Sequence, residues 1–242
     1  MPLILYPEAS ARPAVITPHP TRPFAVVQCE QRSAAWFEAR LGRVTGSVAG
    51  AVWDRTKKGE RTAEWKKLQD KLLAERLTGV SMEDAFMSYD MQRGVDLEPV
   101  AKARLEDRLG VVIRSTGFLR RSDMPAGASL DGDIDDFAAV VEIKCPRTTT
   151  HLGYIEAKGL PDTYVGQCLH NLYISGAERL VFASFDDRLP KHLQLFVYDV
   201  AAKDLPVEEY GEQLRTFLFE LGQRQAALDA GYAVEMAEEA AA

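Results

Sequence analysis

The stretch that most constrains the fold of this chain is Ser129–Pro146, SLDGDIDDFAAVVEIKCP. Within it, residues 140–145 are rich in β-branched side chains and predict a short strand, in which side chains alternate between two faces. Glu142 and Lys144 would therefore share one face, while the apolar residues beside them occupy the other. The sequence thus places a charged pair in a strand whose other residues suit a buried sheet.

The residues upstream of this strand can pair with it. Asp135 and Asp136 favour a turn, and a tight hairpin about Asp136-Phe137 places residues whose numbers sum to 273 opposite each other. Asp131 then faces Glu142. Directly opposed residues have Cβ atoms roughly 4.5–5.5 Å apart, and like charges there destabilise a sheet unless a cation lies between them. Because oxygen ligands suit magnesium, the stretch predicts either a metal site or a salt-bridged edge strand.

The composition is typical of a soluble globular protein. The 242 residues, 46% hydrophobic and 27% charged, fit one large domain or two small ones. No apolar run approaches the roughly 20 residues that a membrane helix needs, and no basic leader opens the sequence. The three scattered cysteines predict neither a disulfide framework nor a zinc or iron–sulfur site. We therefore expect a cytoplasmic protein with no membrane partner.

The charge is unevenly distributed along the chain. The formal net charge is −7, yet residues 40–76 carry ten Lys/Arg against five acids, and residues from 203 onward carry three bases against nine acids. Only local charge matters to a bound phosphate. The basic segment therefore indicates either a contact with a polyanion or a solvated helix face of mixed charge.

Periodicity and capping signals predict one domain over residues 1–242, with a central mixed sheet flanked by helices. The expected strands are 24–28, 111–113, 116–119, the 130–145 hairpin, 180–185 and 193–200. The expected helices are 34–41, a short one from 45, 62–77, 88–109 with a restart at Asp96 because of Pro99, 163–175 and 206–228. Residues 1–23 are expected to form an irregular arm and residues 230–242 a frayed tail.

A third carboxylate is expected on a helix. Glu98 shares a helix face with apolar residues such as Leu105, where an unpaired carboxylate is costly; its alternative role is to complement the helix dipole. Metal ions held by Asp131 and Glu142 would lower the pKa of bound water. Lys144 could then orient that water, or deprotonate it if its own pKa is depressed. The alternative is a purely structural Glu–Lys pair.

Five sequence blocks then occur in a recognisable order over about residues 33–175. They are Ala35-Trp36 with residues 39–47, Arg93-Gly94 with Glu98, Ser129-Leu130-Asp131-Gly132, Glu142-Ile143-Lys144-Cys145-Pro146, and Tyr164-Val165-Gly166-Gln167. With these blocks the chain resembles the phage lambda exonuclease family, the alkaline exonucleases of viral recombination. The resemblance implies the restriction-endonuclease-like α/β core of the PD-(D/E)xK nuclease superfamily.

The resemblance also implies roles for particular residues. The implied metal ligands are Asp131, Glu142 and the carbonyl of Ile143, with Glu98 reaching a second metal through water. Lys144 would be the catalytic lysine, supported by Gln167 and Tyr164. The implied cofactor is a pair of Mg²⁺ ions, for which Mn²⁺ would substitute.

A second set of residues is implied to hold DNA. Arg40, Ser47 and Ser129 resemble the pocket for a 5′-terminal phosphate, Met91 an apolar wedge between the end base pairs, and Arg55 or Lys57 a contact with the DNA backbone. The family carries an arginine a few residues after the Cys-Pro, where this chain has Thr148-Thr149-Thr150. Arg147 is the candidate to replace it.

The implied activity is digestion of one strand of linear double-stranded DNA from its 5′ end, which releases mononucleotides and leaves a 3′ single strand. Such enzymes form ring-shaped trimers around DNA and work with a single-strand annealing protein, which here would place the chain in a bacterial host as a phage or prophage product. A ring that encircles DNA needs positive charge only along its channel, so its outer surface can be acidic, which is compatible with the net charge of −7. The alternatives are a repair or restriction-type endonuclease with the same core, and a catalytically silent DNA-end-binding scaffold.

Overall fold

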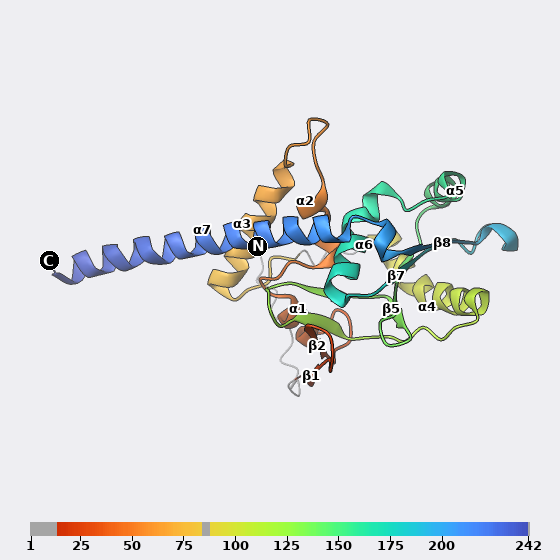
Figure 1. Cartoon of the computed structure of the whole chain (residues 1–242), viewed down its shortest axis with the longest axis horizontal. Coiled ribbons are helices and arrows are strands. Elements are labelled where there is room, and N and C mark those ends of the chain that lie inside the picture. The colour runs from red at the N-terminus through yellow and green to blue at the C-terminus, as the bar shows by residue number, and fades with distance from the viewer. Residues whose placement is uncertain (1–13, 84–87, 242) are drawn as a thin grey trace.

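The computed structural model describes residues 14–83 and 88–241, whose strands form two four-stranded sheets flanked by helices (Figure 1). The first sheet is antiparallel, in the order β1 (Ile16–Pro18), β2 (Phe24–Val27), β3 (Phe118–Arg121), β4 (Gly127–Ser129). The second is mixed, in the order β5 (Gly132–Ile134), β6 (Ala139–Lys144), β7 (Arg179–Phe185), β8 (Leu195–Ala201). The predicted α/β class with a mixed sheet between helices is confirmed, and the antiparallel strands form a sheet of their own.

The predicted hairpin is present in the predicted register. Gly132 pairs with Val141 and Ile134 with Ala139, so the residue numbers sum to 273. The turn between the strands holds Asp135, Asp136 and Phe137 at φ of 50°, 54° and 64°. Aspartate tolerates this left-handed region better than most residues, which explains why the Asp-Asp pair lies there.

Helices complete the two layers. The long ones are α3 (Ala63–Thr78), α4 (Tyr89–Leu109), α5 (Thr148–Ala157), α6 (Asp162–Ser175) and α7 (Val207–Ala241). The short ones are α1 (Ala34–Arg40), α2 (Gly50–Trp53) and the single turns η1 (Gly46–Val48), η2 (Lys191–Leu193) and η3 (Ala202–Asp204). The segment that contains α5 and α6 joins the parallel strands β6 and β7, because parallel strands need a crossover connection.

Helix α4 differs from its prediction, because it runs through Pro99 without a restart. The hydroxyl of Ser88 caps it by accepting a hydrogen bond from the amide of Met91. Pro99 lies on the exposed side of the helix, where water can serve the carbonyl that the proline ring leaves without a backbone donor.

Three other predictions of secondary structure were also wrong. Residues 111–113 form no strand, and the strand after α4 begins at Phe118. Residues 16–18, within the predicted irregular arm, form β1 and pair with β2, while residues 1–13 lie outside the described residues. Helix α7 continues through the predicted tail to Ala241 and extends beyond the other elements (Figure 1), because its alanine- and glutamate-rich sequence favours helix.

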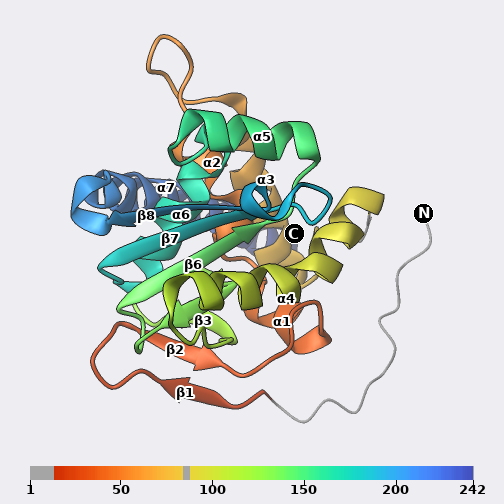
Figure 2. The same ribbon diagram turned by 90° about the vertical axis from the view of Figure 1, so that its right-hand side faces the viewer.

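Both faces of the β5–β8 sheet are covered. Helix α4 packs on one face, where Val141 and Ile143 are buried, and α6 and α7 enclose a core on the other, where Val140 is buried (Figure 2). The predicted alternation of faces in β6 is therefore confirmed. Glu142 and Val140 share the α6 side, which leaves the Glu142 carboxylate completely buried. Among the described residues, no helix is long and apolar enough to cross a membrane.

A buried histidine joins α6, α7 and β4. His170 Nε2 lies 2.8 Å from the carbonyl oxygen of Gly127, and Nδ1 lies 2.7 Å from the Tyr210 hydroxyl. Because a carbonyl only accepts, Nε2 carries the proton and Nδ1 accepts from Tyr210. Burial lowers the pKa of His170 to about 4, so the ring stays neutral in the folded protein at neutral pH.

This contact predicts a pH-dependent stability. At pH values between the lowered pKa of about 4 in the folded protein and the ordinary pKa of about 6.5, His170 binds a proton in the unfolded state but not in the folded state. The contribution of His170 to stability is therefore complete above about pH 6.5 and decreases as the pH falls towards 4. We expect this residue to account for a loss of about 2 kcal/mol in the free energy of unfolding between about pH 7.5 and about pH 5. Urea denaturation of the wild type and of His170→Gln at both pH values measures it. An equal pH dependence in the two proteins would contradict the assignment.

Candidate active site

Two carboxylates meet at the open end of the β5–β6 hairpin. Asp131 directly precedes β5, and continuing the register places it opposite Glu142. The amide of Ile143 donates a 2.6 Å hydrogen bond to Asp131 Oδ2. The hairpin therefore produces the proximity of two acids that the sequence predicted.

The electrostatics of this pair reflect its burial. The pKa of Asp131 is raised well above its ordinary value, first by burial and then by the negative charge of Glu142. The same two causes, in the same order, raise the pKa of Glu98. The charge of Glu142 thus disfavours ionisation of Asp131 and of Glu98, and a bound cation would relieve that repulsion.

Lys144 places a positive charge beside the two acids. Its Nζ lies 2.5 Å from Glu142 Oε1 and donates a 3.2 Å hydrogen bond to Gln167 Oε1. Burial alone would lower the pKa of Lys144, but the charges of Glu142 and Asp131 raise it above its ordinary value. The ammonium form is therefore favoured, which suits a side chain that orients water or a phosphate oxygen rather than one that accepts a proton.

One face of α6 carries polar residues towards this end of the sheet. Gln167 contacts Lys144, and the Tyr164 ring centroid lies 4.8 Å from Lys144 Nζ. Asn171, one turn further along, donates a 2.8 Å hydrogen bond from Nδ2 to Glu142 Oε2. The sequence assigned no role to Asn171, although its spacing of seven residues from Tyr164 on the same polar stripe was the available signal.

Glycine allows the neighbouring helices to approach α6 closely. A Cβ on Gly46 would lie 2.9 Å from Asn171 Oδ1, and a Cβ on Gly166 would lie 2.8 Å from the Cα of Gly50. A Cβ at Gly166 would collide with the backbone of Gly50, and a Cβ at Gly46 would displace the Asn171 side chain. The turn η1, which carries Ser47, therefore packs directly against α6, the helix whose Asn171 side chain donates a hydrogen bond to Glu142.

The three residues predicted to hold a terminal phosphate lie together around Trp36. Arg40 donates a 3.0 Å hydrogen bond from Nη2 to Ser47 Oγ and stacks 4.0 Å from the centre of the Trp36 ring. Trp36 Nε1 donates a 2.8 Å hydrogen bond to Ser129 Oγ. Arg40 also forms a 2.7 Å ion pair with Glu83. We call Arg40, Ser47 and Ser129 the phosphate cluster; Ser129 precedes Asp131 by two residues.

A cleft of about 370 Å³ contains most of the predicted site. The residues that line it are Arg32, Asp90, Met91, Gly94, Val95, Glu98, Asp131, Ile143, Lys144, Cys145, Pro146 and Tyr164. Met91 lies on the first turn of α4 and is 48% exposed. Arg147 forms a 2.5 Å ion pair with Asp90 of the cleft wall, so the candidate for the missing family arginine lies at the cleft rim.

Two predicted DNA contacts are not brought to the cleft. The Arg55 guanidinium donates to the carbonyl oxygens of Val52, Trp53 and Asp54 and to the side chain of Gln213. Arg55 therefore ties its loop to α7. Lys57 is exposed in the same loop, and neither residue lines the cleft.

The donor set fits a magnesium ion. Glu142 Oε1 is buried, and its close partner among the described residues is the Lys144 ammonium. No three His, Cys, Asp or Glu side chains among the described residues form a metal cluster by themselves, so Glu98 does not complete a ligand set with Asp131 and Glu142. Magnesium suits such a site, because it typically takes one or two carboxylates and keeps several waters.

Comparison with known proteins identifies the family. A model described as "YqaJ-like viral recombinase domain" matches residues 35–178, and no curated protein gives a significant match. The solved alkaline exonuclease LHK-Exo from Laribacter hongkongensis is 32% identical, with 83% of this chain and 98% of that chain covered and a TM-score of 0.73. Its complex with dAMP gives the same values.

A further solved structure, a phage-related exonuclease from Haemophilus somnus 129PT, shares the fold. It is 12% identical over 77% of this chain and 96% of its own, with a TM-score of 0.58. The family match spans more than half of the chain and includes the hairpin acids and α6. The resemblance to the lambda-type alkaline exonucleases is thereby confirmed, and the chain belongs to the YqaJ-like viral recombinase family.

Proposed function

We propose that this chain is a magnesium-dependent 5′→3′ exonuclease that degrades one strand of linear double-stranded DNA to mononucleotides. Its exonuclease relatives indicate a nuclease. The observation that carries the finer proposal is the arrangement of Asp131, Glu142 and Lys144 at one end of the hairpin, two residues along the chain from the phosphate cluster.

The proposed chemistry divides between a metal and the residues of the chain. When bound, Mg²⁺ would lower the pKa of a coordinated water and neutralise charge on the phosphodiester. Asp131, Glu142 and the Ile143 carbonyl would hold it, with Mn²⁺ as a substitute and Glu98 positioned to reach a second ion through water. Lys144 would orient the attacking water, because its ammonium is fixed by Gln167.

The phosphate cluster supports action from a 5′ end. The Arg40 guanidinium already binds an anionic group, the Glu83 carboxylate, and the Ser47 hydroxyl adjoins it. An arginine with neighbouring hydroxyls suits a terminal phosphate, since the planar guanidinium can donate two parallel hydrogen bonds. A 5′-phosphate would compete with Glu83 for this position.

Other parts of the proposal rest on the relatives. The structure of LHK-Exo in complex with dAMP supports a mononucleotide product for this chain. The family resemblance supports a ring-shaped homotrimer around DNA and a 3′ overhang passed to a single-strand annealing protein. It also supports a cytoplasmic location in a bacterial host, with the gene carried by a phage or prophage.

Loss of the central charges should abolish cleavage. We expect Glu142→Ala and Lys144→Ala each to slow mononucleotide release from 5′-phosphorylated linear DNA by about a hundredfold to ten-thousandfold, with DNA binding retained. Lys203→Ala, which replaces an exposed lysine that does not line the catalytic cleft, is the matched control. Time courses with Mg²⁺ or EDTA measure the effect. Rapid cleavage of a covalently closed circle, or undiminished activity in EDTA, would contradict the proposal.

Arg40 should determine the preference for a phosphorylated end. Arg40→Ala removes the guanidinium, so we expect the rate on 5′-phosphorylated duplex to fall to that on 5′-hydroxyl duplex. Arg40→Lys keeps the charge but not the two-pronged donor and should keep part of the preference. The cleavage rates of the wild type, Arg40→Ala and Arg40→Lys on 5′-phosphorylated and 5′-hydroxyl duplexes test this prediction. Equal slowing on both ends would show that the phosphate is bound elsewhere.

Asn171 should control the affinity for the metal. Without its hydrogen bond, Glu142 loses the partner that fixes its Oε2, and we expect Asn171→Ala to raise the half-saturating Mg²⁺ concentration by about 10- to 100-fold. The rate at saturating Mg²⁺ should fall less. Ser175→Ala, one turn further along α6, removes a hydroxyl that contacts only nearby backbone and serves as control. An unchanged Mg²⁺ requirement in Asn171→Ala would contradict this role.

A further inference from the structure

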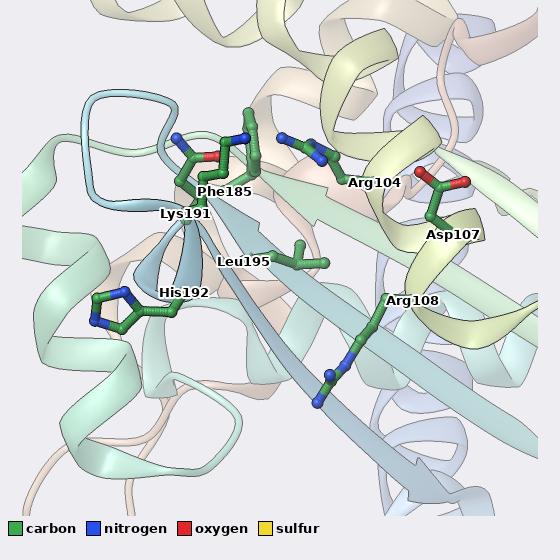
Figure 3. Close-up of a pocket in the computed structure, with 8 residues that line it drawn as sticks. Arg104, Asp107, Arg108, Phe185, Lys191, His192 and Leu195 are labelled. Atoms are coloured by element: carbon green, nitrogen blue, oxygen red, sulfur yellow. The ribbon is translucent and has the colours of Figure 1, made fainter.

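A second cavity, of about 330 Å³, lies outside the catalytic cleft between the C-terminal half of α4 and the connection from β7 to β8 (Figure 3). Its lining residues are Arg104, Asp107, Arg108, Phe185, Lys191, His192, Gln194 and Leu195. None of these residues lines the catalytic cleft. We call this cavity the basic pocket.

Three cations, Arg104, Arg108 and Lys191, line the basic pocket. Arg104, Arg108 and Lys191 form neither a hydrogen bond nor an ion pair through their side chains within the described parts of the chain. In Figure 3, Arg104 and Lys191 point toward one another. Asp107 is the one carboxylate in the lining against these three cations. Such an excess of unpaired positive charge, in a chain with net charge −7, favours an anion between the facing groups.

Arginines elsewhere in the fold show the contrast. Arg93 pairs with Asp186, Arg114 with Asp133, and Arg121 with Asp123. The guanidinium groups of these three arginines form internal ion pairs. Arg104 and Arg108 of the basic pocket have no such pair among the described residues, so they can bind an external anion.

The connection that carries Lys191 is held rigidly. Gln194 donates 2.9 Å hydrogen bonds from Nε2 to the carbonyl oxygens of Asp187 and Leu189. The His151 ring nitrogen Nε2 lies 2.8 Å from the Leu193 carbonyl oxygen. Lys191 is therefore presented on a preorganised turn, which reduces the ordering that a bound anion must impose.

The basic pocket and the catalytic cleft open at the same end of the sheet. Strand β6 ends at Lys144 and the parallel β7 ends at Phe185, with Lys144 paired to Ser184. Arg93 joins the two regions, because it donates to the carbonyl oxygens of residues 145 and 146 and pairs with Asp186. Neighbouring strands are about 4.8 Å apart, so β6 and β8 are separated by about 10 Å, which corresponds to about three nucleotides along one strand of a duplex.

We propose that the basic pocket is a second phosphate-binding subsite, which holds the DNA backbone a few nucleotides from the cleaved bond. The proposal rests on the nuclease function proposed above and extends it to the path of the substrate. Arg104 and Lys191 bind a phosphodiester group between them, and Arg108 adds positive charge at the pocket edge. The backbone is recognised by charge alone, so binding here is independent of sequence.

The test compares two double variants with equal changes in charge. Arg104→Gln/Lys191→Gln neutralises the basic pocket, while Lys158→Gln/Lys203→Gln neutralises two exposed lysines outside both cavities. Fluorescence anisotropy measures binding of a 5′-phosphorylated duplex in Ca²⁺ between about 50 and 200 mM salt. Each phosphate contact contributes about 0.9 to the slope of log affinity against log salt. The pocket variant should reduce the slope by about one to two units, and the control should match the wild type.

The outcomes separate the basic pocket from the nuclease proposal. Equal salt slopes in the wild type and the pocket variant would overturn the proposed subsite. The same result would be obtained if the pocket binds an acidic protein instead of DNA. Failure of the wild type to hydrolyse DNA in Mg²⁺ would overturn the nuclease proposal. With saturating DNA, the control variant should keep the wild-type turnover rate. If the double variant does not fold, Lys191→Gln alone, on an external turn, should lower the slope by about 0.9.

Discussion

The opposition of Asp131 and Glu142 across the β5–β6 hairpin is the constraint on which the rest of this structure depends. Two carboxylates at this separation destabilise a sheet, and burial raises the cost of their charge. The fold partly offsets that cost with the Ile143 amide, the Asn171 side chain and the Lys144 ammonium. These contacts hold the acids in place, and the repulsion that remains favours a divalent cation.

The layers around the hairpin bring the two acids and the phosphate cluster together. Helix α6 packs on the face of β6 that carries Glu142, and its polar stripe contacts both members of the charged pair. Gly46 and Gly166 let η1 and α2 lie directly against α6, which brings the phosphate cluster close to the acids. Helix α4, on the other face, supplies Glu98 to the catalytic cleft and Arg104 to the basic pocket.

Local signals in the sequence predicted the hairpin and several helix starts, because period-two alternation, the Asp-Asp turn and a capping residue such as Ser33 act over a few residues. The division into two sheets was not predictable in this way, since β2 pairs with β3 across about ninety residues of chain. The continuity of α4 depends on the exposed side of Pro99, and the role of Asn171 depends on how α6 packs against β6. Both are consequences of tertiary packing that no local pattern contains.

The most direct test of the central claim is a crystal structure of the protein grown with Mn²⁺, whose anomalous scattering locates the ion. The account predicts an anomalous peak between the carboxylates of Asp131 and Glu142, next to the Ile143 carbonyl. A structure in which these two side chains turn away from each other, with no peak between them, would contradict it.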